Sequence, residues 1–199
     1  MSEQIRILID YWNLQLQWNE RTQKAPLDWT KLPSLLVEEA GKISGLGACE
    51  YQGTKLYASV DKTSSDGRKL TTWLVSFIDR LPGVNVEIRE REPKPFEIHC
   101  RECKTLITTC PNCNRPLRKA VEKGVDTAIV TDLFSLAWAK AYTTAVLVSS
   151  DSDFVPAVKN LQEKGLKIIN ATWSGLGLQL ARTCWASLVI DAFIPRLTR

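Results

Sequence analysis

The chain has 199 residues, of which 44% are hydrophobic, and a formal net charge of +4. This length and apolar content suffice for the core of one domain over residues 1–199, and no apolar run approaches the roughly 20 residues that cross a membrane. The N-terminus lacks the basic start and the apolar segment of a signal peptide, so we expect a cytoplasmic protein with no membrane partner.

The first half of the chain alternates between strand and helix patterns. Apolar residues recur in short runs or near helical spacing, and turns rich in Gly, Pro and Ser separate them. The predicted order is a strand at 6–10, a polar surface segment at 14–26, a helix at 27–40 with Asp28 as its N-cap, a strand at 55–60, a helix at 70–81 and a strand at 84–92. The last strand alternates apolar with charged residues, which is typical of the edge of a sheet.

The second half repeats this alternation after an interruption at 93–116. The predicted order is a long helix that opens at Gly124 to Asp126, a strand at 145–149 buried on both faces, a helix after Asp153, a strand at 166–171, a helix at 176–184 and a strand at 188–190. Strands that alternate with helices of about ten or more residues predict βαβ units. We therefore expect an α/β fold with a parallel sheet and right-handed crossovers.

Aspartates follow two of the predicted strands. Asp10 ends the first strand, and Asp151 and Asp153 follow the strand at 145–149. The carboxyl ends of parallel strands form the edge at which ligands bind, so these acids would meet there and require a cation. Each aspartate alone is more often a helix N-cap, but their convergence favours Mg²⁺ or Mn²⁺ and metal-assisted hydrolysis of a phosphodiester.

Four of the six cysteines lie in one short window. Cys100 and Cys103 form one C-x2-C pair, and Cys110 and Cys113 form a second pair after six intervening residues. Two such turns supply the four thiolates of a tetrahedral Zn²⁺ site, with His99 as an alternative ligand. Disulfides or unpaired surface thiols are the other interpretations. We expect a structural zinc ribbon or knuckle inserted at 97–116, without an open coordination position for catalysis.

Positive charge is concentrated around the insert. Nine Lys or Arg and five Glu lie between residues 89 and 123, and the rest of the chain is formally neutral. An ordinary solvated surface would explain this pattern. The alternative is that basic side chains, including Arg115, Arg118 and Lys119, follow a phosphate backbone close to the acids.

Three motifs in this order resemble the NYN domain, a branch of the PIN-like nuclease superfamily. They are I-L-I-D-Y-W-N at 7–13, E-K-G-V-D-T-A-I-V-T-D at 122–132 and V-L-V-S-S-D-S-D-F-V-P at 146–156. The resemblance covers nearly the whole chain apart from the insert. The resemblance implies a flavodoxin-like parallel sheet and metal-dependent RNA cleavage.

Residue roles follow from the resemblance by motif position. Asp10, Asp126, Asp151 and Asp153 would be the acidic metal ligands, Asn13 would orient a ligand, water or phosphate, and Lys123 would meet a substrate phosphate. Asp132 matches a second helix acid, but six residues place it off the face of Asp126. Family members often carry Gly where Ser150 stands, and Ser fits there unless the turn needs a positive φ.

These observations predict a Mg²⁺- or Mn²⁺-dependent endoribonuclease with RNA as its partner. Trp12 and Trp18 are candidates for stacking on bases, although core packing is the alternative for Trp12 and surface packing for Trp18. One rival is a catalytically silent RNA-binding or adaptor protein of the same fold. Another is a Toprim-like nucleic-acid enzyme, which would leave Asp126 without a role. A homo-oligomer or a protein partner would use the edge strand at 84–92 or the insert.

Overall fold

The structure is a computed structural model that describes residues 2–45, 48–121 and 124–199. Its centre is a six-stranded sheet in the order β10-β9-β8-β1-β2-β3. All neighbouring strands pair in parallel. The strands are β1 (Glu3–Asp10), β2 (Cys49–Val60), β3 (Val84–Glu90), β8 (Thr144–Val148), β9 (Lys167–Thr172) and β10 (Ala186–Val189). The α/β fold predicted from the alternating pattern is confirmed, and β3 lies at one edge as predicted.

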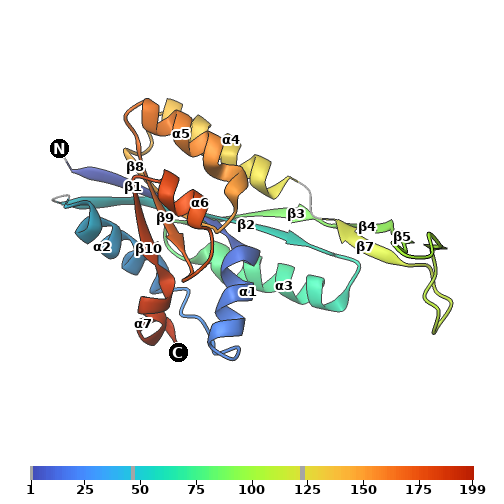
Figure 1. Cartoon of the computed structure of the whole chain (residues 1–199). Helices are drawn as coiled ribbons and strands as arrows, with labels where there is room; N and C mark the ends of the chain where they lie inside the picture. The colour runs from blue at the N-terminus through green and yellow to red at the C-terminus, as the bar shows by residue number, and fades with distance from the viewer. Residues whose placement is uncertain (1, 46–47, 122–123) are drawn as a thin grey trace.

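Helices cover both faces of the sheet (Figure 1). The helices are α1 (Tyr11–Arg21), α2 (Leu32–Ser44), α3 (Ser65–Ser76), α4 (Val125–Trp138), α5 (Val155–Glu163), α6 (Leu178–Thr183) and α7 (Ile194–Leu197), with short 3-10 turns η1 (Ile78–Arg80), η2 (Ser152–Phe154) and η3 (Ile190–Phe193). One core cluster joins α1, α2, α3 and α7 to the sheet, and the other joins α4, α5 and α6. None of the described helices is long and apolar enough to span a bilayer.

The central strands send side chains into both clusters. In β1, Ile7 and Ile9 belong to the first cluster and Leu8 to the second. In the neighbouring β8, Val146 packs into the first cluster and Leu147 into the second. The continuous apolar runs follow from this burial, because a strand covered on both faces has no position that prefers a polar residue.

The prediction of a polar surface segment at 14–26 is wrong. Residues 11–21 form α1, whose buried side chains are Tyr11, Leu14 and Trp18. Trp18 is fully buried, and its Nε1 donates to the carbonyl of Ala25 at 2.6 Å, so it cannot stack on a ligand. Three apolar residues with helical spacing are enough to bury one face although the rest of the segment is polar.

The helix predicted at 27–40 begins only at Leu32. Asp28 is not its N-cap; its carboxylate accepts hydrogen bonds from the backbone N–H and the hydroxyl of Thr30 in the preceding turn. Pro33 lies in the first helical turn, where the missing N–H of proline costs no hydrogen bond.

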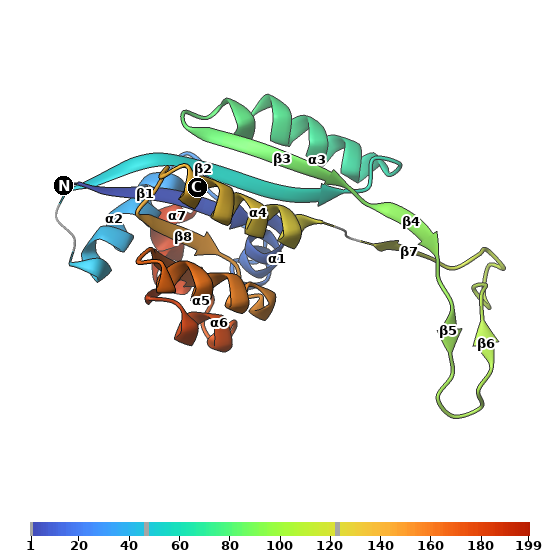
Figure 2. The same ribbon diagram turned by 90° about the horizontal axis from the view of Figure 1, so that it is seen from above.

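The interruption between β3 and α4 forms a ribbon that projects from the sheet (Figure 2). Its strands are β4 (Glu92–Pro95), β5 (Ile98–His99), β6 (Leu106–Ile107) and β7 (Arg118–Val121). The β4–β7 and β5–β6 pairs are both antiparallel. The ribbon is therefore longer than the predicted insert at 97–116. The chain returns to the main fold just before α4.

Candidate metal centre

Three aspartates gather at the carboxyl edge of the sheet. Asp126, Asp151 and Asp153 each offer a carboxylate oxygen, and these oxygens lie within 4.8 Å of one another. Asp126 is in the first turn of α4, whereas Asp151 and Asp153 follow β8. Like charges this close repel each other unless a cation or a proton intervenes. Oxygen ligands in such a group suit Mg²⁺ or Mn²⁺.

The turn after β8 holds two of these acids in place. The Asp151 carboxylate accepts a hydrogen bond of 2.9 Å from the backbone N–H of Asp153, and thereby caps the η2 turn. The hydroxyl of Ser149 accepts one of 3.2 Å from the N–H of Asp151. Asp151 is therefore both an N-cap and a member of the acidic group, because one carboxylate has enough lone pairs for both roles.

Asp10 lies in the same cleft but outside this group of three. The cleft has a volume of about 510 Å³, and its lining includes Asp10, Asn13, Asp126 and Asp151. Asp10 is only 7% exposed, and its carboxylate accepts a hydrogen bond of 3.2 Å from the N–H of Asn13 at the start of α1. The Asn13 side chain in turn accepts from the N–H of Ser150 at 2.9 Å. The ends of β1 and β8 are thus connected at the cleft.

Asn170 supports the same turn and was missed by the sequence analysis. It is fully buried in β9, and its amide donates to the carbonyls of Leu147 and Ser149 at 3.1 and 2.8 Å. Its side-chain oxygen makes no hydrogen bond within the described part of the chain. The available signal was a polar residue between the apolar Ile168-Ile169 and Ala171 in the middle of this strand.

Ser150 fits its turn without strain. It is absent from the described non-glycine residues with positive φ, and its hydroxyl pairs with that of Thr172 at 2.7 Å. Gly177 approaches from the loop before α6 with φ +61°, and a Cβ there would come within 2.8 Å of the Ser150 Cα. Glycine at position 177 therefore permits this close approach.

The model of the NYN domain matches residues 5–184. The chain belongs to the NYN domain family. The fold also resembles the crystal structure of a protein of unknown function from Vibrio parahaemolyticus, with a TM-score of 0.58 and 20% identity over 96% of this chain and 94% of that chain. A comparison with curated proteins gave no match. The NYN domain is a PIN-like nuclease family, and this member carries the three-aspartate group described above.

Asp132 of this NYN domain lies away from the acidic group. Its carboxylate forms an ion pair of 2.5 Å with Lys55 and accepts a hydrogen bond of 2.6 Å from the Tyr57 hydroxyl, both on β2. Burial, followed by this hydrogen bond and the negative charge of Asp132, raises the pKa of Tyr57 above its usual value. Asp132 thus fastens α4 to the sheet.

Three of the four basic residues predicted to bind substrate lie on the ribbon. Arg115 and Arg118 are exposed, with Arg118 paired to Pro95 between β7 and β4. Lys119 is in β7, but its side chain lies outside the part of the structure that can be described, and Lys123 lies outside the described residues altogether. The ribbon returns at Gly124, two residues before Asp126.

The two C-x2-C segments fold into matching turns. In the first turn, the N–H of Cys100 donates to the carbonyl of Thr105, and the carbonyl of Cys100 accepts from the N–H of Lys104. Cys110 makes the same pair of bonds with Arg115 and Asn114. Lys104 and Asn114 both have left-handed backbones, with φ of 59° and 54°.

Hydrogen bonds favour the thiolate form in both turns. Bonds from Thr105, with a smaller contribution from Cys100, lower the pKa of Cys103 to about 7. The N–H groups of Asn112 and Cys113 lower the pKa of Cys110. Within the described residues, however, only the aspartates form a group of three or more potential ligands within 4.8 Å. The structure therefore shows two metal-compatible pairs but does not bring the four sulfurs to one point.

Proposed function

We propose that this NYN domain is a ribonuclease that hydrolyses internal phosphodiester bonds of RNA at a Mg²⁺ or Mn²⁺ ion. The observation that carries the proposal is the group of Asp126, Asp151 and Asp153 oxygens within 4.8 Å. Two of these acids, Asp126 and Asp151, line a cleft together with the buried Asp10. Membership of a PIN-like nuclease family supports the same chemistry. The involvement of Asp126 also favours this function over a Toprim-like enzyme, which has no use for an acid at this position.

The side chains have distinct roles in this proposal. Asp126, Asp151 and Asp153 hold the ion, and Asp10 adds negative charge to the wall of the cleft. Asn13 keeps the turn after β8 in register with the end of β1 through its bond to Ser150. A bound Mg²⁺ or Mn²⁺ supplies an activated water molecule and stabilises the departing oxygen of the phosphodiester.

The ribbon completes the proposed RNA-binding surface. It leaves the sheet after β3 and returns before α4, so it begins and ends at the edge that carries the aspartates (Figure 2). Arg115, Arg118, Lys119 and Lys123 would contact phosphates. The two cysteine pairs would close on one structural Zn²⁺ and stiffen the ribbon. The exposed edge of β3 and the ribbon are the proposed surfaces for a protein partner or a second copy, and a cytoplasmic location is part of the proposal.

Cleavage of an end-labelled single-stranded RNA tests this function. We expect internal cuts with Mn²⁺ or Mg²⁺, none with EDTA, and a loss of at least about a hundredfold in Asp126→Asn and Asp151→Asn. Glu163→Gln, which changes an exposed acid at the far end of α5, is the matched control and should cut like the parent. A parent that binds RNA without cutting it would instead identify a silent binding or adaptor protein.

A further inference from the structure

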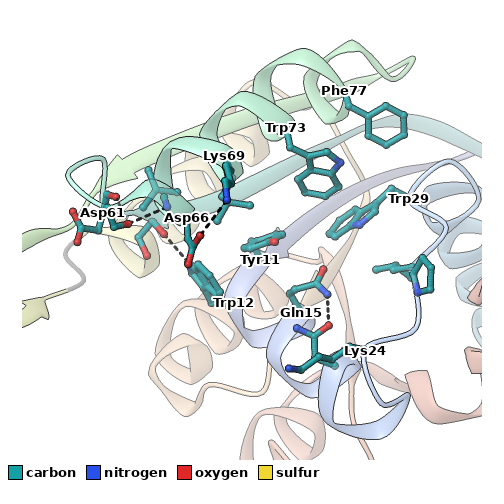
Figure 3. Close-up of a pocket in the computed structure, with 18 of the residues that line it drawn as sticks. Tyr11, Trp12, Gln15, Lys24, Trp29, Asp61, Asp66, Lys69, Trp73 and Phe77 are labelled. Atoms are coloured by element: carbon teal, nitrogen blue, oxygen red, sulfur yellow. Dashed lines mark hydrogen bonds and ion pairs between the residues drawn. The ribbon is translucent and has the colours of Figure 1, made fainter.

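A second and larger cleft lies beside the metal centre. It has a volume of about 790 Å³ and opens between α1 and α3 (Figure 3). Trp12 lines both this cleft and the one that contains Asp10, Asp126 and Asp151. The two clefts therefore adjoin at this side chain, and a strand bound at the metal centre can continue into the second cleft.

Aromatic rings form the walls of this second cleft. Tyr11 and Trp29 stack with centroids 6.0 Å apart and an angle of 21°, and Trp73 meets Trp29 edge-on at 5.8 Å. Phe77 continues the row beyond Trp73, as Figure 3 shows. Tyr11 and Trp29 are buried, but Trp73 and Phe77 are only partly buried and face the open volume. Exposed aromatic faces are surfaces on which flat heterocycles stack.

The cleft also contains a polar group without a partner. Tyr11 is 5% exposed, and its hydroxyl makes no hydrogen bond to any residue that the structure describes. Burial raises the pKa of Tyr11 to about 12, so the hydroxyl keeps its proton at neutral pH. The hydroxyl oxygen is not among the fully buried polar atoms, so it is accessible and a ligand with polar edges in the cleft can hydrogen-bond to it.

The rim of the cleft is positively charged overall. Its cationic residues are Lys24, Lys69, Arg91 and Arg199, against the acids Asp61 and Asp66. The Arg91 guanidinium lies 4.8 Å from the centre of the Trp12 ring, and its Nε donates to the Ser59 hydroxyl at 2.8 Å. Cations around an aromatic cleft suit a ligand that joins a flat ring to phosphate.

We propose that this cleft receives an unpaired base of the RNA whose backbone crosses the metal centre. The inference rests on the proposed nuclease function and names a part of its substrate site. Trp73 and Phe77 stack on the base, and the Tyr11 hydroxyl hydrogen-bonds to its edge. The Lys69 ammonium group pairs with the phosphate that follows this base in the RNA strand. The enzyme would therefore require single-stranded RNA on that side of the cut.

Binding of short labelled RNAs in EDTA tests the cleft without any cleavage. One abasic nucleotide is moved along the strand, and the affinity is measured for the parent, Trp73→Ala, Tyr11→Phe and Lys69→Glu. We expect the abasic nucleotide to weaken binding by the parent about fivefold or more at one position, the loss typical of one stacked base. In Trp73→Ala the affinity should no longer depend on the position of the abasic nucleotide. Tyr11→Phe should alter the base preference at that position.

Two controls separate folding and charge from base binding. Lys69 is exposed, so Lys69→Glu should fold normally and weaken binding, whereas Lys159→Glu on α5 makes the same charge change outside the cleft and should bind like the parent. A flat abasic profile in the parent, or equal affinities for Lys69→Glu and the parent, would overturn the proposal. A parent that shows the profile but never cuts with Mn²⁺ would leave the base site standing and refute only the nuclease.

Discussion

The side-chain oxygen of Asn13 accepts a hydrogen bond of 2.9 Å from the backbone N–H of Ser150. The two residues are far apart in the sequence, but β1 and β8 are neighbouring parallel strands, so the turns that follow them lie side by side. Asp10 is the last residue of β1, and Asp151 lies in the turn after β8. This single contact therefore fixes the spacing of acids contributed by two separate parts of the chain.

We predict that Asn13→Ala lowers both stability and cleavage. Loss of the acceptor leaves the Ser150 N–H unpaired, which should cost about 1–2 kcal/mol of unfolding free energy. A shift of the turn should slow cleavage by about tenfold to a hundredfold, because small misplacements of catalytic groups are costly. Urea unfolding and initial cleavage rates measure the two effects. Glu20→Ala, an exposed change on the same helix that lines neither cleft, should leave both values unchanged.

Two acids on α4 should differ in their effect on metal binding. Asp126→Asn removes one of three clustered carboxylates, so titration with Mn²⁺ should show a loss of the site. Without metal, this variant should be as stable as the parent or slightly more stable, because repulsion is relieved. Asp132→Asn should keep Mn²⁺ binding, since Asp132 contacts Lys55 and Tyr57 instead. Equal losses of Mn²⁺ in both variants would contradict this assignment.

Asp132→Asn should instead destabilise the fold. The ion pair with Lys55 is largely shielded, with side chains 24% and 18% exposed, so its loss should cost about 1–3 kcal/mol in urea unfolding. Asp66→Asn is the comparison, because the pair of Asp66 and Lys69 is 3.8 Å long and its side chains are 93% and 81% exposed. That change should stay within about 0.5 kcal/mol of the parent.

The cysteine turns should bind one zinc ion together. Protein prepared without chelators should contain about one Zn²⁺ per chain in excess Mg²⁺, and Cys103→Ser or Cys113→Ser should lose it. Cys49→Ser should retain it. Alkylation provides a second measurement, since the four insert thiols should react only after zinc is removed. Burial raises the pKa of Cys184 to about 12, so that thiol should remain unmodified in both states. Zinc retained by the insert variants would refute the four-cysteine site.

The Asp28 carboxyl group should make the free energy of unfolding depend on pH in the acid range. Hydrogen bonds from Thr30, followed by the charge of Arg199 and the bond from Lys31, hold the pKa of Asp28 below its usual value of 3.8. A depressed carboxyl pKa stabilises the fold above pH 3.8, and this contribution is lost as the pH falls through the lower folded-state pKa. Asp28→Asn should therefore be less stable than the parent at pH 7, with a difference that shrinks toward pH 2. Parallel stability curves for the two proteins would contradict the assignment.

Much of the fold could be predicted because local patterns decide it. The apolar runs that become β1 and β8 are followed directly by Asp10 and Asp151, and parallel pairing places the ends of neighbouring strands at one edge of the sheet. The opening of α4 at Gly124 and the two cysteine turns were equally visible, since turn residues and ligand spacing are properties of a few consecutive residues.

Other features depend on contacts between distant segments, and only the tertiary structure decided them. The burial of Trp18 and the whole of α1 follow from packing against the first face of the sheet, which composition alone does not reveal. Asn170 supports the turn after β8 from a neighbouring strand, and the aromatic cleft combines residues of α1 and α3 with Trp29. Sequence determines which residues each element can present, but which of them meet depends on how those elements pack.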